Sequence, residues 1–118
     1  MVKPGSIALL RFPHTDLARD SLRPVLLLAP TPDPYPDCLV AMISSQMHQA
    51  VHGPVEVIHE RDPDFPATGL KRSSVVRLSR LAVVEEKPLL GKLGEISPER
   101  FRKVVHRLCG WITASLPG

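Results

Sequence analysis

Two apolar runs separated by a segment of prolines and aspartates constrain this chain more than any other feature. The runs occupy 23–30 and 38–46 and are rich in Val, Ile and Leu. The segment between them, 31–37, contains three prolines and two aspartates, which cannot continue either strand and favour a turn. We therefore predict a β-hairpin over 23–46.

The position of the turn decides which residues of the hairpin face each other. If the turn is centred near residues 33 and 34, antiparallel pairing aligns residues whose numbers sum to about 67 or 68. Arg23 then lies beside Ser44 or Ser45, with the two backbones ~5 Å apart. A guanidinium and a hydroxyl thus meet at one end of the hairpin, and this arithmetic leaves both serines open.

Proline is frequent, with 13 residues among 118, and most prolines fall between apolar runs. This spacing favours many short strands over long helices. The expected strands cover 5–12, 23–30, 38–46, 55–58, 73–78 and 80–84, and 89–93 is interpreted as a further strand or a turn. Long polar loops are expected over 13–22 and 59–69, with a short polar connection over 47–54. The length and the lack of internal repeats predict one domain over 1–118.

A helix start is encoded near the C-terminal end. Ser97 can cap free backbone N–H groups, Pro98 suits the first helical position, and Glu99 lies near the positive end of the helix dipole. The helix is expected to run to about Ser115 and to pack one apolar stripe on the sheet. That stripe comprises Phe101, Val104, Val105, Leu108, Ile112 and Ser115, with Trp111 beside it. The basic residues, among them Arg100, lie mostly off the stripe and favour a solvated face, with an electrostatic docking surface as the alternative.

These elements predict a mainly β fold with a C-terminal α-helix, namely a small, strongly bent, SH3-like antiparallel barrel. No apolar run approaches the ~18 to 20 residues that span a bilayer, and the N-terminus lacks the apolar core of a secretory signal. A cytoplasmic protein is therefore expected. Cys38 and Cys109 are too few and too scattered for a disulfide framework, and both are interpreted as reduced packing residues.

The net charge of +3 and the pI near 9.2 are mildly basic, which on its own indicates a polyanionic partner only weakly. Aromatic residues make up only 4% of the chain, so few rings are available to stack on bases. Any contact with nucleic acid should therefore depend on Arg, Lys and backbone donors.

Motifs that bind cofactors are lacking in the sequence. It has no Gly-rich phosphate loop, no Cys-x-x-Cys and no nucleophile-elbow serine. His48 and His52 are four residues apart, but Gly53 and Pro54 follow at once, so a helix that presents both to a metal is not expected. We predict neither a metal nor a nucleotide cofactor.

The remaining candidate for a functional site is the end of the hairpin, where Arg23 lies beside Ser44 or Ser45 and the 13–22 loop approaches them. Such end residues are commonly only solvated. The functional interpretation is that the guanidinium matches phosphate oxygens and the hydroxyl adds a hydrogen bond to the same group. Charge that develops on a phosphodiester could be stabilised there without a metal. His14, Thr15 and Asp16 of the loop are candidate proton carriers or phosphate contacts.

Several segments, in order along nearly the whole chain, resemble the MazF/PemK-like toxins of type II toxin–antitoxin systems. They are Gly5-Ser6-Ile7, Arg11-Phe12-Pro13-His14-Thr15-Asp16, Arg23-Pro24-Val25-Leu26, Val40 to Gln46, Gly69 to Leu78 and Gly91 to Ser97. The chain departs from the family pattern at Ser6, where an acid is common, and at Ser73 and Ser74, where a proline or acid often stands.

The resemblance implies the SH3-like barrel of the MazF, PemK and CcdB toxin type, a homodimer, and metal-independent cleavage of single-stranded RNA by its own 2′-hydroxyl. It implies that Arg23 and Ser44 are catalytic, and it thereby favours Ser44 over Ser45. It further implies an RNA channel that an antitoxin peptide would also occupy. The RNA-binding residues predicted on this basis are His14, Thr15, Asp16, Arg19, Ser45 and Gln46.

The leading hypothesis is therefore a sequence-selective endoribonuclease toxin. One alternative is a non-enzymatic toxin of the same fold, similar to the gyrase-binding poisons, which would act through its helix and surface. Another is a catalytically weakened module that binds RNA or antitoxin without cleavage, for which salt-dependent RNA binding is expected.

Overall fold

The computed structural model describes residues 3–13, 20–32, 36–86 and 89–118. The strands in this part of the chain are β1 (Ser6–Pro13), β2 (Asp20–Pro30), β3 (Asp37–Ser44), β4 (Val55–Ile58), β5 (Ser74–Glu85) and β6 (Leu89–Glu95). The helical segments are η1 (Met47–Val51), α1 (Phe65–Thr68) and α2 (Pro98–Thr113).

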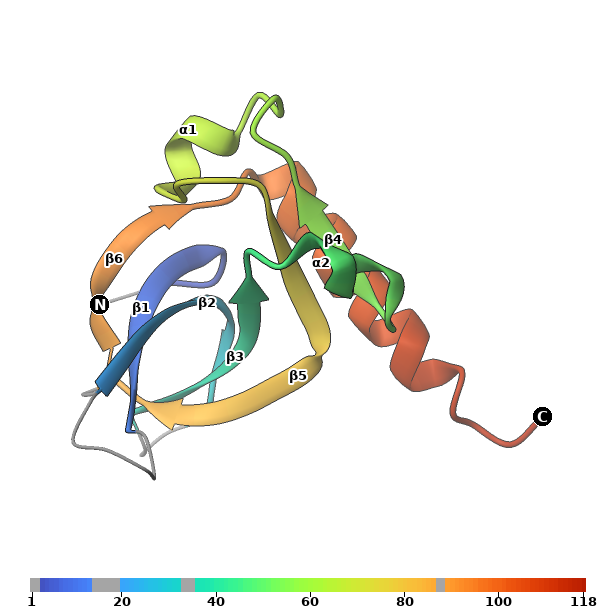
Figure 1. The fold of residues 1–118 in the computed structure, drawn as a ribbon. Helices are drawn as coiled ribbons and strands as arrows, with labels where there is room; N and C mark the ends of the chain where they lie inside the picture. Colours follow the sequence, from blue (N-terminus) through green and yellow to red (C-terminus); the bar gives the residue numbers. More distant parts are fainter. Residues whose placement is uncertain (1–2, 14–19, 33–35, 87–88) are drawn as a thin grey trace.

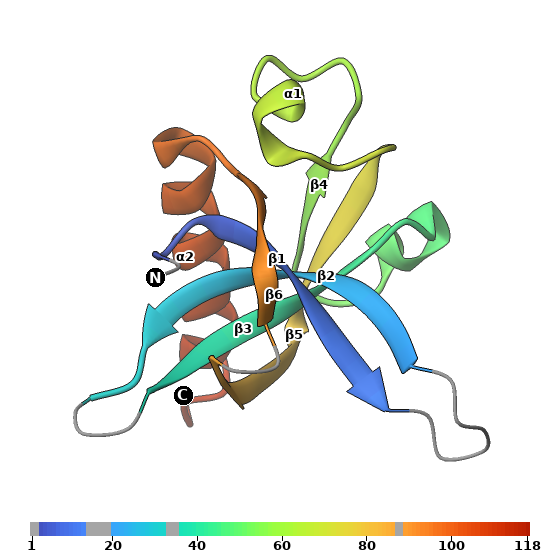
Figure 2. The same cartoon turned by 90° about the vertical axis from the view of Figure 1, so that its left-hand side faces the viewer.

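The six strands form one antiparallel sheet in the order β4-β5-β3-β2-β1-β6. The sheet curls into an incomplete ring (Figure 1), and the β1–β2 and β2–β3 hairpins end on opposite sides of the molecule (Figure 2). Within the described residues, the edge strands β4 and β6 do not pair with each other, so the barrel stays open. The predicted mainly β fold with a C-terminal helix is confirmed.

The predicted hairpin is formed by β2 and β3 in the expected register. Val25 pairs with Met42, a sum of 67, and Pro30 pairs with Cys38, a sum of 68. Both faces of this hairpin are buried, because Leu26 belongs to a core cluster that also contains residues of α2, whereas Val25 belongs to a second cluster. The apolar runs are therefore continuous instead of alternating.

The sequence predicted two strands over 73–78 and 80–84, and this was wrong. β5 is one strand that bends, because its pairing with β3 shifts between Ala41, which faces Leu81, and Met42, which faces Arg77. The intervening residues 78–80 form an insertion in the ladder that kinks the strand. The sequence resembled two strands because Ser79 and Arg80, polar residues of this insertion, separate two apolar runs.

The predicted polar loops differ from the structure in extent. β1 continues to Pro13 and β2 begins at Asp20, so the expected loop over 13–22 is shortened from both ends. Short helical turns occupy 47–51 and 65–68, where the sequence predicted only connections. These turns are too short to leave a helical period in the sequence.

Helix α2 begins as predicted and ends two residues early. The Ser97 side chain accepts a hydrogen bond from the Arg100 backbone N–H at 3.2 Å. Val104 and Leu108 are buried, but Val105 is exposed and Ile112 is 54% exposed, so the predicted stripe packs only as far as Leu108. The C-terminal end of α2 extends past the sheet (Figure 1), and its apolar residues are therefore exposed. No helix among the described residues is long and apolar enough to cross a membrane.

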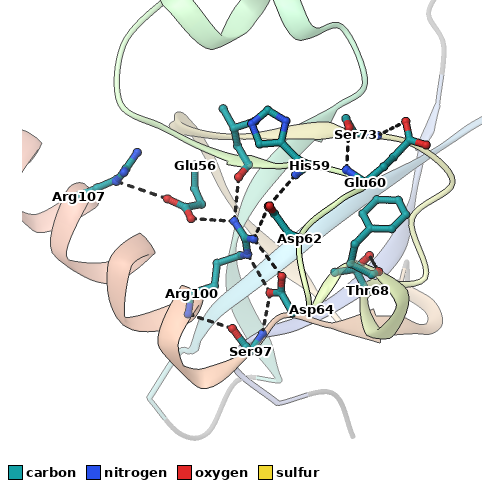
Figure 3. A network of polar contacts seen from close by, with 12 residues as sticks. Glu56, His59, Glu60, Asp62, Asp64, Thr68, Ser73, Ser97, Arg100 and Arg107 are labelled. Atoms are coloured by element: carbon teal, nitrogen blue, oxygen red, sulfur yellow. Dashed lines mark hydrogen bonds and ion pairs between the residues drawn. The ribbon is translucent and has the colours of Figure 1, made fainter.

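Arg100 does not belong to the solvated face that the sequence predicted for the helix. Its guanidinium is only 11% exposed and forms ion pairs with Glu56 at 2.9 Å, Asp62 at 2.7 Å and Asp64 at 2.8 Å (Figure 3). Hydrogen bonds from Arg100 lower the pKa of Asp64 to about 2. This cluster ties the start of α2 to the segment that follows β4.

The two cysteines have different environments. Cys38 is buried in the core, as predicted, and burial raises the pKa of its thiol. Cys109 is exposed on α2, so its interpretation as a packing residue was wrong. It directly follows Leu108, the last buried residue of α2.

Candidate active site

Arg23, in the first half of β2, and Ser44, the last residue of β3, come together at one end of the β2–β3 hairpin. The ladder between these strands stops at the Val25–Met42 pair, and the same register continued by two residues places Arg23 level with Ser44. Arg23 is exposed and Ser44 is partly buried. Both line two adjoining cavities of about 620 and 650 Å³, which form one groove.

The register separates Ser44 from Ser45. Arg23 is two residues from Val25 and Ser44 is two residues from Met42, so both share the face of this cross-strand pair. Ser45 follows the end of β3 and lines only the larger cavity. The geometry therefore favours Ser44 as the hydroxyl beside Arg23, as the family resemblance does.

Basic residues surround this pair on both sides. The smaller cavity contains Arg77 and Arg80, and the larger contains Lys71 and Arg72. Among the described residues, no Asp or Glu lines either cavity. Because nothing acidic in this lining offsets the cations, their fields add and the groove attracts anions.

The kink in β5 positions the basic residues of the smaller cavity. Arg77 is the last residue of β5 that pairs with β3 before the shift, and Ser79 and Arg80 belong to the insertion. An uninterrupted ladder would keep these side chains at regular positions on the sheet, whereas the insertion turns the segment toward the end of β3. The irregularity that the sequence did not predict therefore helps to build the site.

The segment that carries Lys71 and Arg72 is held by a tight turn. Gly69 ends α1 with a φ of 73°, and a Cβ there would lie 2.3 Å from the Leu93 carbonyl oxygen. Beyond the two basic residues, the Glu60 backbone N–H donates to the Ser73 hydroxyl at 2.9 Å. Close packing at one end and a hydrogen bond at the other thus fix the basic segment.

The walls of the two cavities differ in polarity. The larger cavity is lined partly by leucines, namely Leu9, Leu22, Leu70 and Leu93. The smaller one is lined mainly by basic and uncharged polar side chains. No aromatic residue of the described chain lines either cavity, in line with the expectation that any nucleic-acid contact depends on Arg and Lys.

Two glutamines lie beside the Arg23–Ser44 pair. The Gln46 backbone N–H donates to the Ser44 Oγ at 3.1 Å, which ties the loop after β3 to that hydroxyl. The Gln49 Nε2 donates to the Gln46 Oε1 at 3.2 Å. Gln46 lines both cavities and Gln49 lines the smaller one.

Only some of the site residues predicted from the sequence can be placed in the structure. Arg23, Ser44, Ser45 and Gln46 lie together in the groove. His14, Thr15, Asp16 and Arg19 lie outside the described residues. Sequence reasoning did not select Gln49 or the basic residues Lys71, Arg72, Arg77 and Arg80. Arg77 could have been selected as a candidate site residue, because it is a charged residue within an apolar strand.

No group of three or more His, Cys, Asp or Glu side chains in the described ranges could hold a metal ion. His48 belongs to the short turn η1 and His52 follows it, so they do not share the face of a regular α-helix. The groove offers guanidinium, ammonium, hydroxyl and amide groups, which suit a phosphate ligand.

The fold and the groove define a small β-rich protein with a cationic, phosphate-compatible groove. The family model described as "PemK-like, MazF-like toxin of type II toxin-antitoxin system" matches residues 3–112, so the chain belongs to this family. The resemblance stated from sequence is thereby confirmed. No curated protein sequence matches the chain.

Two solved structures share the fold. The Mycobacterium tuberculosis toxin MazF-mt6 has a TM-score of 0.64 and 16% identity, with 92% of this chain and 96% of that chain covered. An endoribonuclease in complex with its cognate antitoxin, from a mycobacterial species, has a TM-score of 0.63 and 12% identity, with 99% and 100% covered.

Proposed function

We propose that this toxin-family protein is a metal-independent, sequence-selective endoribonuclease that cleaves single-stranded RNA. The observation that carries the proposal is the pairing of Arg23 with Ser44 in a groove lined by further cations and, among the described residues, by no acid. A polyanion would be attracted along the groove and would meet a guanidinium and a hydroxyl at its centre.

In the proposed reaction, the 2′-oxygen of the substrate forms a bond to the adjacent phosphorus while the bond from phosphorus to the 5′-oxygen breaks. The 2′-hydroxyl loses a proton and the leaving 5′-oxygen gains one, so the products are a 2′,3′-cyclic phosphate and a 5′-hydroxyl. Arg23 stabilises the charge that develops on the phosphate oxygens, and Ser44 positions the phosphate by a hydrogen bond.

The proposal includes an antitoxin that occupies the same groove, a homodimer and a cytoplasmic setting. A related fold is seen with its cognate antitoxin, which supports a protein partner of this kind. The leucines of the larger cavity, beside Lys71 and Arg72, suit a peptide with both apolar and acidic side chains.

The test is cleavage of a long RNA in EDTA by the wild type and by Arg23→Ala. If Arg23 stabilises the transition state as proposed, the variant should cleave at least ~100-fold more slowly. Arg102→Ala is the matched control, because Arg102 is exposed on α2 and lines neither cavity. Equal rates for wild type and Arg23→Ala, or no cleavage by either, would refute the proposal.

A comparison of Ser44→Ala with Ser45→Ala tests the choice of hydroxyl. Ser44 shares the face of Arg23 and Ser45 does not, so Ser44→Ala should reduce the cleavage rate by about tenfold or more and Ser45→Ala should change it little. Initial rates on one defined oligonucleotide measure both. A larger loss of cleavage rate for Ser45→Ala would show that Ser45, and not Ser44, lies beside Arg23.

A non-enzymatic toxin remains the second candidate because Trp111 and Ile112 of α2 and Leu116 just beyond it are exposed. Such a toxin would arrest growth through this surface. Growth arrest that survives Arg23→Ala but is lost in Trp111→Ser would favour it. Salt-dependent RNA binding by the wild type with no cleavage would favour the binding module instead.

A further inference from the structure

Gln46 is placed to contact the nucleotide next to the reacting phosphate. The residues common to both cavities are Arg23, Ile43, Ser44 and Gln46, so Gln46 lies at the junction that holds the proposed catalytic pair. Its backbone is tied to Ser44 by the 3.1 Å hydrogen bond to Oγ. Its side chain is exposed and can meet a base whose phosphate lies at Arg23.

The Gln46 carboxamide has a defined direction. The Gln49 Nε2 donates to the Gln46 Oε1 at 3.2 Å, and the Gln49 backbone N–H donates to the Gln46 carbonyl at 3.0 Å. The side-chain bond engages the acceptor end of the Gln46 amide. The other end, Nε2, carries two N–H donors and is the one available to a ligand.

Burial of the Gln49 amide disfavours the opposite orientation of the two amides, in which Gln46 would donate to Gln49. The Gln49 Oε1 is buried and has no hydrogen-bond partner among the described residues. If both amides turned over, the Gln49 NH₂ would occupy this buried position with its donors unpaired. Unpaired buried N–H groups are rarer in proteins than carbonyls that lack a partner. The arrangement in which Gln49 donates to Gln46 is therefore the more stable one.

A donor presented alone selects among the bases. The carbonyl oxygens O4 of uracil and O6 of guanine accept from N–H groups, whereas adenine places its N6 donor amine beside the N7 acceptor, so an amide NH₂ group meets a like donor there. Glutamine pairs with adenine by using both its oxygen and its nitrogen, which requires the oxygen that Gln49 engages here.

We propose that Gln46 is a specificity residue that selects uracil or guanine over adenine next to the scissile phosphate, and that Gln49 sets this preference by engaging the Gln46 oxygen. The inference rests on the proposed function, since it describes how the same groove chooses its RNA. Gln49 acts through Gln46 and is a positioning residue.

The test maps cut sites in a randomised RNA with the wild type and three Gln49 variants. The wild type should favour uracil or guanine over adenine about tenfold at one position beside the cut. Gln49→Glu offers only an acceptor, so the Gln46 amide should turn and the preference should reverse toward adenine. Gln49→Ala should weaken the preference, and Gln49→Lys, which still donates to the Gln46 oxygen, should keep it.

The outcomes separate this inference from the endoribonuclease proposal. Cleavage with the wild-type base preference retained in Gln49→Glu would overturn the role of Gln49 and leave the activity intact. If the wild type cuts no RNA, the activity is refuted, and binding of 2′-O-methyl oligonucleotides, which cannot be attacked, measures the base preference instead. Equal binding of uracil-, guanine- and adenine-containing oligonucleotides would then overturn the inference.

Discussion

Two arginines of this protein stand in opposite surroundings. Arg100 is 11% exposed, and its guanidinium donates to Glu56, Val57, Asp62 and Asp64 at 2.7 to 2.9 Å. Arg23 is exposed in the first half of β2, in a groove whose described lining contains only basic, polar and apolar residues.

The difference indicates what each arginine can do. The Arg100 guanidinium is paired inside the molecule with three carboxylates, so the cluster stabilises the contact between α2 and the segment after β4. The basic groove around Arg23 has no such internal partner among its described lining residues and favours an external anion. Charge in a buried cluster therefore supports the fold, and charge left unbalanced in a groove supports binding.

Removal of Arg100 should have the largest effect. Arg100→Ala leaves three carboxylates close together without their cation, and we expect the free energy of unfolding to fall by about 3 to 5 kcal/mol. Urea unfolding measures this loss. Arg107→Ala is the control, because Arg107 is 54% exposed and its pair with Glu56 is longer, at 3.4 Å. Similar losses of stability in both variants would contradict the stabilising role of the Arg100 ion pairs.

Acid should weaken the same cluster by a smaller amount. The pKa of Asp64 is lowered to about 2 by Arg100, so its carboxylate stabilises the fold above its unfolded pKa near 4. This contribution, about 2 kcal/mol, should disappear as the pH falls from about 4 to 2. Urea midpoints at several pH values measure the loss. Asp64→Asn should flatten the curve in this interval, and an unchanged slope would refute the role of Asp64.

The smallest effect is expected from one basic residue of the groove. Lys71→Ala should leave stability unchanged and weaken binding of a 2′-O-methyl RNA. If Lys71 contacts one phosphate, the salt slope of log affinity should decrease by about 0.7. Lys103→Ala, on the exposed part of α2, is the control for net charge. A slope that changes equally in both variants would mean that the effect is not local to the groove.

The features that the sequence predicted well depend on neighbouring residues. The hairpin register follows from the prolines between 31 and 37, and the cap at Ser97 follows from the residues just after it. Both are decided by backbone conformations and hydrogen bonds within a short segment. The kink in β5 was missed because it depends on pairing with β3, and the turn η1 was missed because it is too short to leave a helical period.

In the candidate site, too, some residues could be placed from neighbouring residues in the sequence and others only from contacts between distant elements. Arg23 and Ser44 could be aligned by counting along one hairpin. Arg77, Arg80 and Lys71 reach the groove only through the kink of β5 and the turn at Gly69, which no local pattern predicted. The orientation of the Gln46 amide likewise depends on Gln49 in a helical turn that the sequence did not predict.

By itself, the sequence determined the hairpin, the helix start and the mainly β class, because short-range sterics and capping decide each of them. The tertiary structure decided what the charges do. Arg100 meets Asp64, Asp62 and Glu56 across 36, 38 and 44 residues of chain, so a side chain that appeared solvated became buried and paired. The cations around Arg23 gather in one groove only when β2, β3, β5 and the segment between α1 and β5 meet, because electrostatic fields depend on distance in space and not along the chain.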